Sequence, residues 1–226
     1  MSTIKKNTEV SEVEEIRKKT SRSIVQNQKL ITGIIIAVVV LIGGYFGYQA
    51  FIQKPNEEKA SNAMFTAEQY FGMDSFSLAL NGDGQKDGFA NVISKYGSTK
   101  AGNLARYYAA ACYLHLGQPQ EAVKHLEKFN AKGTDFEALS AGLLAAAYDE
   151  SGNKEKALDQ YTKAVKFKNA MTAPFYLRCA SIIAYDLGKT QDAVTFEQQI
   201  KKEYPNSPQS RDTDKYLALY GHISFD

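Results

Sequence analysis

The chain has 226 residues, of which 44% are hydrophobic and 23% are charged, and its formal net charge is +2 at pH 7. This composition excludes a wholly disordered polyelectrolyte and allows a soluble domain with a substantial core. Lys and Arg nearly balance Asp and Glu, 27 against 25, so we expect no basic face and no nucleic-acid partner.

Residues 1–29 form a charged N-terminal tail. It carries seven Lys or Arg and four Asp or Glu, and no aromatic residue. A segment of this kind buries too little apolar surface to fold alone. We therefore predict that residues 1–29 are mostly disordered.

The next segment, Leu30 to Ile52, is an uncharged and mostly apolar run. As a helix it is roughly 35 Å long, enough to cross a hydrocarbon core of about 30 Å. It exceeds the apolar core of a usual signal peptide, so an uncleaved transmembrane helix is predicted. The excess of Lys and Arg before it predicts a single-pass protein with a cytoplasmic N-terminus and a C-terminal domain across the membrane. Gly43 and Gly47 have the spacing of a helix-dimer motif, but glycine is common in membrane helices and dimerisation stays open.

Residues 53–226 contain an internal repeat. A tyrosine, a glycine and an alanine recur with shifts of 35 and 36 residues, the third tyrosine being one place out of register: Tyr113, Gly117, Ala122; Tyr148, Gly152, Ala157; Tyr185, Gly188, Ala193. The pattern predicts helical hairpins, because glycine ends a first helix in the left-handed conformation and alanine lets the second helix approach closely. Thr134 and Glu137 have the spacing of a capping box that would begin a further helix.

This repeat resembles the tetratricopeptide repeat (TPR) family, whose unit is a 34-residue helix–turn–helix. The resemblance covers Asn103 to Pro205 and implies an all-α superhelix with units at about 103–136, 138–172 and 174–205. A degenerate hairpin at 57–97 is expected before these units and a capping helix at 207–221 after them. The chain departs from the family pattern in having no tryptophan and in placing Glu197 where an aromatic residue is usual.

The resemblance also implies a concave groove, lined by the first helix of each unit, that binds protein or peptide segments. The groove positions carried over by register are Tyr107, Ala111, His115, Leu139, Ala146, Asp149, Glu150, Phe175, Arg178, Ile182, Tyr185 and Asp186. The alternative is that these positions form ordinary solvated helix faces and that the protein's own tail fills the groove.

The sequence contains no complete motif for phosphate binding, metal binding or catalysis. The glycine-rich segment at 81–88 lacks the Lys-Ser/Thr of a phosphate loop and the bidentate Glu of a calcium loop, so a hairpin connection is the better interpretation. The histidines have no metal-ligand spacing, and Cys112 and Cys179 fall in apolar helical patterns that favour buried thiols over a disulfide. We therefore predict no cofactor, no metal and no enzymatic activity.

The layout as a whole, a short tail, one span and a TPR-like domain, resembles the single-span ancillary subunits of the bacterial Sec translocon, whose TPR-like domain is periplasmic. The resemblance implies a non-enzymatic protein of a bacterial-type inner membrane, with a periplasmic TPR domain, that holds exported chains or chaperones near the translocon. The alternative is an envelope scaffold that links cell-division, wall-synthesis or outer-membrane assembly proteins.

Overall fold

The computed structural model describes residues 27–222, so the predicted disordered tail at 1–29 lies almost wholly outside the described residues. Within 27–222 every regular element is helical, and the one β-bridge joins Gly82 to Asp87. The chain divides into two compact units, Met1–Pro55 and Asn56–Asp226.

The first unit contains helix α2 (Gln28–Tyr48) and the π-helical turn η1 (Gln49–Gln53). Among the described residues, one helical run, Gln28–Gly72, has the length and apolar composition needed to cross a membrane. None of its most apolar stretch is buried in the structure. The large apolar side chains that the structure describes in α2 are therefore exposed.

The second unit begins with three helices that share one core: α3 (Lys54–Gly72), α4 (Phe76–Asn81) and α5 (Phe89–Tyr96). Helix α4 was not predicted, and its last residue, Asn81, is the first of the segment expected to be a hairpin connection. It forms because Ala79 and Leu80 are buried with Met64 and Phe89. Such a short helix shows little periodicity in the sequence.

Three helical hairpins follow: α6 (Lys100–His115) with α7 (Pro119–Glu127), α8 (Phe136–Glu150) with α9 (Lys154–Val165), and α10 (Ala173–Asp186) with α11 (Thr190–Glu203). Two residues after each first helix ends there is a glycine with positive φ: 69° at Gly117, 81° at Gly152 and 74° at Gly188. Each second helix buries the repeat alanine completely. The local geometry expected from the repeat is thus present in all three hairpins.

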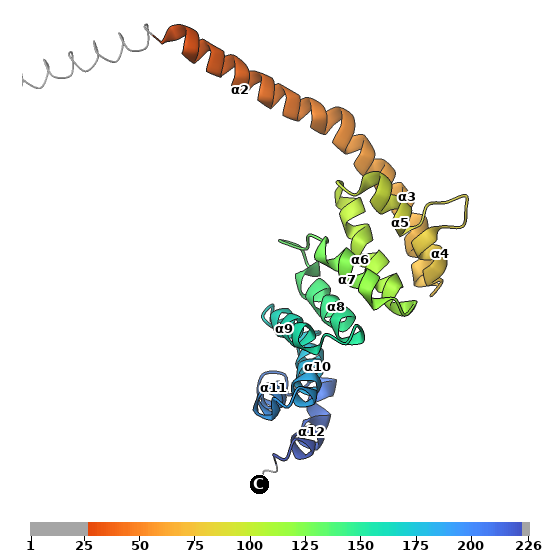
Figure 1. Ribbon diagram of the computed structural model, residues 1–226, viewed down its shortest axis with the longest axis vertical. Coiled ribbons are helices and arrows are strands. Elements are labelled where there is room, and N and C mark those ends of the chain that lie inside the picture. The colour runs from red at the N-terminus through yellow and green to blue at the C-terminus, as the bar shows by residue number, and fades with distance from the viewer. Residues whose placement is uncertain (1–26, 223–226) are drawn as a thin grey trace, which may run out of the picture. The chain divides into compact units, whose positions relative to one another are not determined.

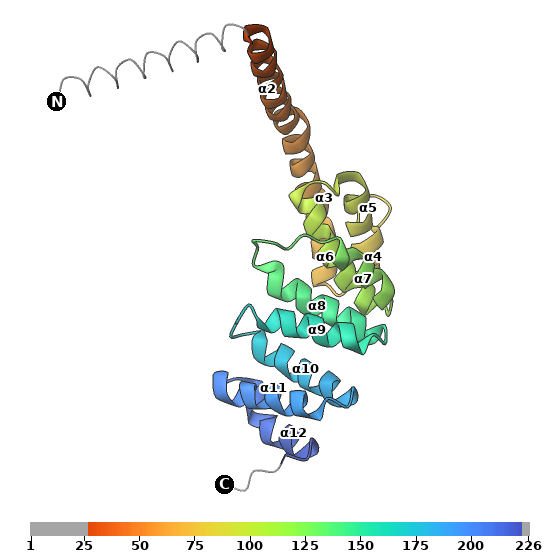
Figure 2. The same ribbon diagram turned by 60° about the vertical axis from the view of Figure 1, so that its left-hand side comes forward.

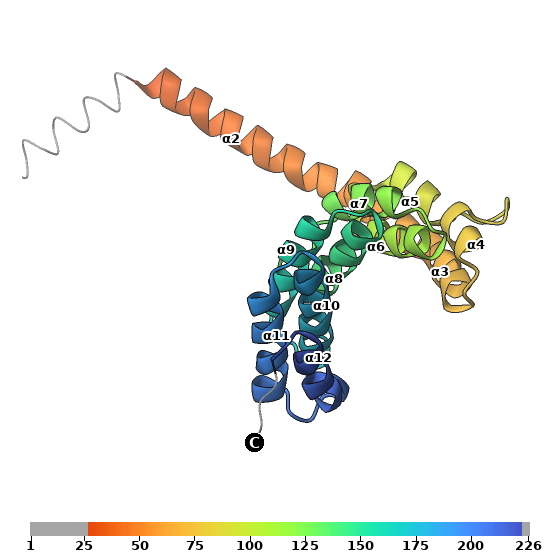
Figure 3. The ribbon, with the colours of Figure 1, turned by 60° about the horizontal axis from the view of Figure 1, so that its bottom comes forward.

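Successive hairpins stack as layers (Figures 1 and 2), which makes this unit an all-α TPR-like superhelix. In Figure 3, α8 and α10 lie on one side of the stack and α9 and α11 on the other. We call the surface formed by α6, α8 and α10 the inner face, because it consists of the first helices of the three hairpins.

The stack ends in a 3-10 turn, η2 (Pro208–Asp212), and a short helix, α12 (Thr213–Leu219). A single helix was expected over 207–221. Ser207 caps the turn by accepting a hydrogen bond from the Ser210 amide. Leu217 and Tyr220 then bury against the last hairpin.

The expected capping box is present only in altered form. Thr134 Oγ1 accepts a hydrogen bond from the Phe136 amide, and Glu137 Oε1 accepts one from Gly133 instead of Thr134. Helix α8 therefore starts two residues after Thr134.

Candidate protein-binding site

The sequence-predicted groove positions differ in how much surface they offer. On α10, Phe175, Ile182 and Tyr185 are exposed by 50%, 39% and 39%. Phe175 and Ile182 lie seven residues apart and fall on one face of a helix with 3.6 residues per turn, and Tyr185 lies at the edge of that face. The Tyr185 ring also contacts Tyr220, with ring centroids 4.7 Å apart. An exposed apolar row of this kind suits a protein-binding surface.

Helix α8 continues this face with smaller side chains. Leu139, Ala146 and Asp149 are half-buried, and Glu150 is exposed. Gly142 on α8 leaves room for the ring of Tyr176 on α10. The Lys154 ammonium forms an ion pair with Asp186, which ties the start of α9 to the end of α10.

Helix α6 offers less of the predicted groove. Tyr107 is half-buried and packs edge-on against Phe136, with ring centroids 5.1 Å apart, and Ala111 is buried. His115 is exposed, but its ring stacks on Phe76 of α4 at 3.9 Å between centroids. His115 therefore contacts α4 as well as solvent.

Arg178 is the predicted groove residue whose position differs most from expectation. It is only 9% exposed, and its guanidinium donates to Glu197 and to the carbonyl of Gln209. The guanidinium also lies over the ring of Tyr216, 3.8 Å from the centroid. Arg178 thus joins the last hairpin to the terminal helix and offers little surface to a partner.

Two hollows lie in the repeat unit, one between α3 and α6 and one at the end of the stack. The α3–α6 hollow has a volume of about 440 Å³ and includes Met64, Phe65, Glu68 and Leu104 in its lining. The sequence signal for it was available: Leu104 precedes Leu139 by 35 residues and Phe175 by a further 36, the two shifts of the repeat. The same register that gave the groove positions therefore points to Leu104.

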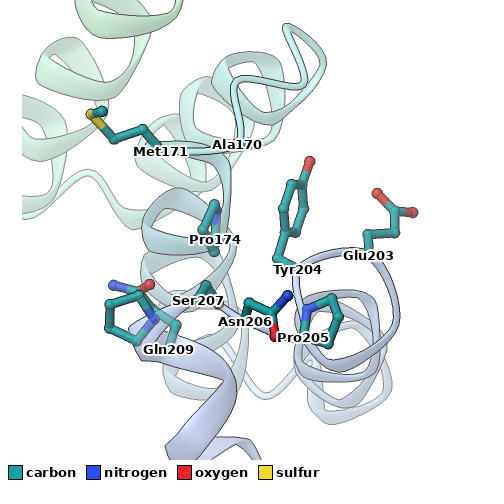
Figure 4. Close-up of a pocket in the computed structure, with 10 residues that line it drawn as sticks. Ala170, Met171, Pro174, Glu203, Tyr204, Pro205, Asn206, Ser207 and Gln209 are labelled. Atoms are coloured by element: carbon teal, nitrogen blue, oxygen red, sulfur yellow. The ribbon is translucent and has the colours of Figure 1, made fainter.

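The terminal hollow, about 510 Å³, lies between the start of α10, the end of α11 and η2. The segment from Tyr204 to Pro208, which closes the last repeat, forms one wall. Figure 4 shows the Tyr204 ring standing between Pro174 and Glu203, with the Met171 side chain at the rim. Met171 is 86% exposed, which extends the apolar surface beyond α10.

The described residues hold no group of three or more His, Cys, Asp or Glu side chains placed to bind a metal ion. Cys112 is buried and Cys179 is half-buried, and both are free thiols. Burial raises the pKa of the Cys112 thiol to about 12 and also raises the pKa of Cys179. Both thiols are therefore protonated and poorly nucleophilic at neutral pH.

Comparison with known proteins agrees with this architecture. A family model described as a tetratricopeptide repeat-like domain matches residues 25–193, and a tetratricopeptide repeat model matches residues 180–207. The chain belongs to the tetratricopeptide repeat-like domain family. No curated protein matches it.

Two crystal structures of TPR-like repeats from a putative kinesin light chain of Podospora anserina, one of them a point variant, share the fold. Each has a TM-score of 0.56 and 19% sequence identity, and covers 73% of this chain. The matches take in 85% and 86% of the two solved chains. At this identity the likeness concerns the fold alone. TPR-like stacks are typical of scaffolds that bind proteins or peptides on an extended concave surface, rather than of enzymes.

Proposed function

We propose that this chain is a membrane-anchored protein that binds segments of other proteins on the inner face of its repeats. The observation that carries the proposal is the apolar row on α10, where Phe175 is half exposed and Ile182 and Tyr185 are more than one-third exposed. Helix α11, on the other side of the same hairpin, places no large apolar residue among those strongly exposed. Apolar anchors at helical spacing suit an extended or helical protein segment.

The anchor in this proposal is helix α2. Its apolar side chains are unburied in the structure, and the family model begins at residue 25, so it includes this helix. Lys and Arg are more frequent before α2 than just after it, which favours a cytoplasmic N-terminus and a repeat domain on the periplasmic side of a bacterial-type inner membrane. Anchoring raises the local concentration of the repeats for any partner at the same membrane.

Within the envelope, we assign the protein to the translocon and its periplasmic chaperone network, where it would hold exported chains or chaperones. The support is the layout of tail, apolar helix and repeats. A scaffold for cell-division, wall-synthesis or outer-membrane assembly proteins would use the same inner face. The identity of the bound proteins separates these two roles.

The test is mild crosslinking in cells, purification of the tagged full chain from membranes, and mass spectrometry of the partners. The informative variant is Phe175→Ser with Ile182→Ser, and the matched control is Leu219→Ser, which removes an apolar side chain that is 60% exposed on α12. We expect translocon subunits or exported chains with the wild type and the control, and a severalfold loss with the double variant. Division or wall-synthesis partners would replace the translocon role by the scaffold role, and equal recovery from the double variant would contradict binding at the inner face.

The anchor has a separate test. We expect the full chain to stay in membranes during alkaline extraction, and protease added to spheroplasts to digest the repeat domain. Release by alkali would contradict the anchor, and protection in spheroplasts with digestion in inverted vesicles would reverse the orientation.

A further inference from the structure

The α3–α6 hollow combines an apolar lining with the carboxylate of Glu68. Met64 and Ala101 are only 4% and 8% exposed, Leu104 is half-buried, and Phe65 on the same face of α3 is 63% exposed. An apolar floor beside a large exposed aromatic ring is a contact surface for the methylene groups of a long side chain.

The charges around this hollow lie at opposite ends. Glu57 is already engaged, because its two carboxylate oxygens accept the amide hydrogens of Lys100 and Ala101 at 2.7 and 2.8 Å. Glu68 lies eleven residues further along α3, about 16 Å at the rise of an α-helix. Lys100 also lines the hollow, and its backbone lies beside Glu57, at the end away from Glu68.

Glu68 forms no hydrogen bond or ion pair with any residue of the described range 27–222. Partial burial raises the pKa of its carboxyl, and the carboxylate charge adds to burial in raising the pKa of Tyr108 on α6. A partly desolvated carboxylate without a partner is stabilised by an incoming cation. An acidic ligand would instead meet like charge at both Glu57 and Glu68.

We propose that the α3–α6 hollow holds an arginine or lysine side chain of a bound protein segment, with its methylene stem against Phe65 and Leu104 and its cationic group at Glu68. This inference rests on the proposed function, since it names the chemistry of one part of the bound segment. The proposal also extends the inner face to helix α3, because Leu104 on α6 occupies the register position of Phe175.

The test measures fluorescence anisotropy with the full chain in nanodiscs and two labelled peptides. One peptide is acetyl-Ser-Leu-Arg-Leu-Phe-Ser-amide, and the other carries citrulline, a neutral isostere, in place of arginine. We expect the arginine peptide to bind at least threefold more tightly at low salt, a preference of the size expected for a partly exposed charge pair, and we expect it to shrink as salt is added.

Three variants locate the preference. Glu68→Gln should abolish the difference between the two peptides, while Glu58→Gln, which removes an exposed carboxylate of the same helix that does not line the hollow, should preserve it. Phe65→Ala should weaken both peptides alike. Equal binding of the two peptides to the wild type, a preference that survives Glu68→Gln, or no binding of either peptide would overturn the inference.

Failure here is distinguishable from failure of the proposed function. The proposed function is tested at Phe175 and Ile182 with cellular partners, and those residues belong to α10. Suppose that the α10 variant loses its cellular partners but the two peptides bind the wild type equally. The proposed function would then stand, and only the proposed site for an arginine or lysine side chain would be contradicted.

Discussion

The guanidinium of Arg178 and the carboxylate of Glu197 form a two-point ion pair inside the last hairpin. Nε is 2.8 Å from Oε1 and Nη2 is 3.1 Å from Oε2. The Glu197 side chain is fully buried and also accepts a hydrogen bond from Ser181, whose hydroxyl lies 3.2 Å from that of Tyr220. The acid that departs from the family pattern therefore has a partner for its charge, and the network ties α10 and α11 to the end of the stack.

Breaking this pair on one side should strongly destabilise the repeat domain. We expect Glu197→Gln or Arg178→Met to lower the free energy of unfolding by about 3–5 kcal/mol, because each leaves a charge or polar group buried without its partner. Urea denaturation followed by circular dichroism measures the loss.

Replacing both partners should cost much less. In Arg178→Met with Glu197→Leu the apolar side chains fill the same space, so we expect the double variant to recover most of the loss of either single variant. Losses that simply add would show that the two residues contribute independently.

Gly142 on α8 makes room for the Tyr176 side chain of α10. A Cβ atom at this position would overlap the ring of Tyr176, so Gly142→Ala should destabilise by about 1–3 kcal/mol despite the better helix propensity of alanine. Gly72→Ala, where a Cβ meets no atom within 4 Å, is the control and should be neutral or slightly stabilising. Thermal unfolding of both variants decides the point, and equal melting temperatures would refute the overlap.

Stability should fall in alkali. Burial raises the pKa of Cys112, Tyr148 and Tyr176 to about 12, above the ordinary values of 9.0 for a thiol and 10.0 for a phenol. The unfolded chain thus loses these protons first, so the stabilisation is fully present below about pH 9 and is lost as pH rises toward 12. The urea midpoint should decline steadily when it is measured at about pH 8, about pH 9.5 and about pH 11. A flat profile would mean that these groups are not buried.

The turn after α4 is held by one carboxylate. Asp83 accepts hydrogen bonds from the amides of Gln85 and Lys86 and from the Tyr70 hydroxyl, and these bonds lower its pKa to about 2. Asp83→Ala should speed hydrogen exchange at the Gln85 and Lys86 amides while the melting temperature changes little, because the turn is exposed. In the wild type, protection of these amides should persist at pH 4 and fade as pH approaches about 2. Unchanged exchange in the variant would contradict this role for Asp83.

The sequence predicted the repeated hairpins well, because their determinants are local. Gly117, Gly152 and Gly188 end three first helices with positive φ, and the alanines five residues beyond them are completely buried. Each position needs a particular residue type for a reason that acts within a few residues, so periodicity reveals it.

The remaining features depend on contacts between distant residues. Arg178 reaches Glu197 across nineteen residues and the carbonyl of Gln209 across thirty-one, and His115 stacks on a phenylalanine thirty-nine positions earlier. A helix register places such side chains on a face but does not say which neighbour covers them. This is why Arg178 was expected in the groove and is found buried.

Site-specific photocrosslinking in intact cells tests the central claim most directly, with photoreactive residues on the inner face at Phe175 or Ile182 and on the outer helix α11 at Gln191 or Thr195, all four exposed. Binding at the inner face predicts adducts to other proteins from positions 175 and 182 and few from positions 191 and 195. Equal yields from both sides, or adducts only within the protein's own chain, would contradict it.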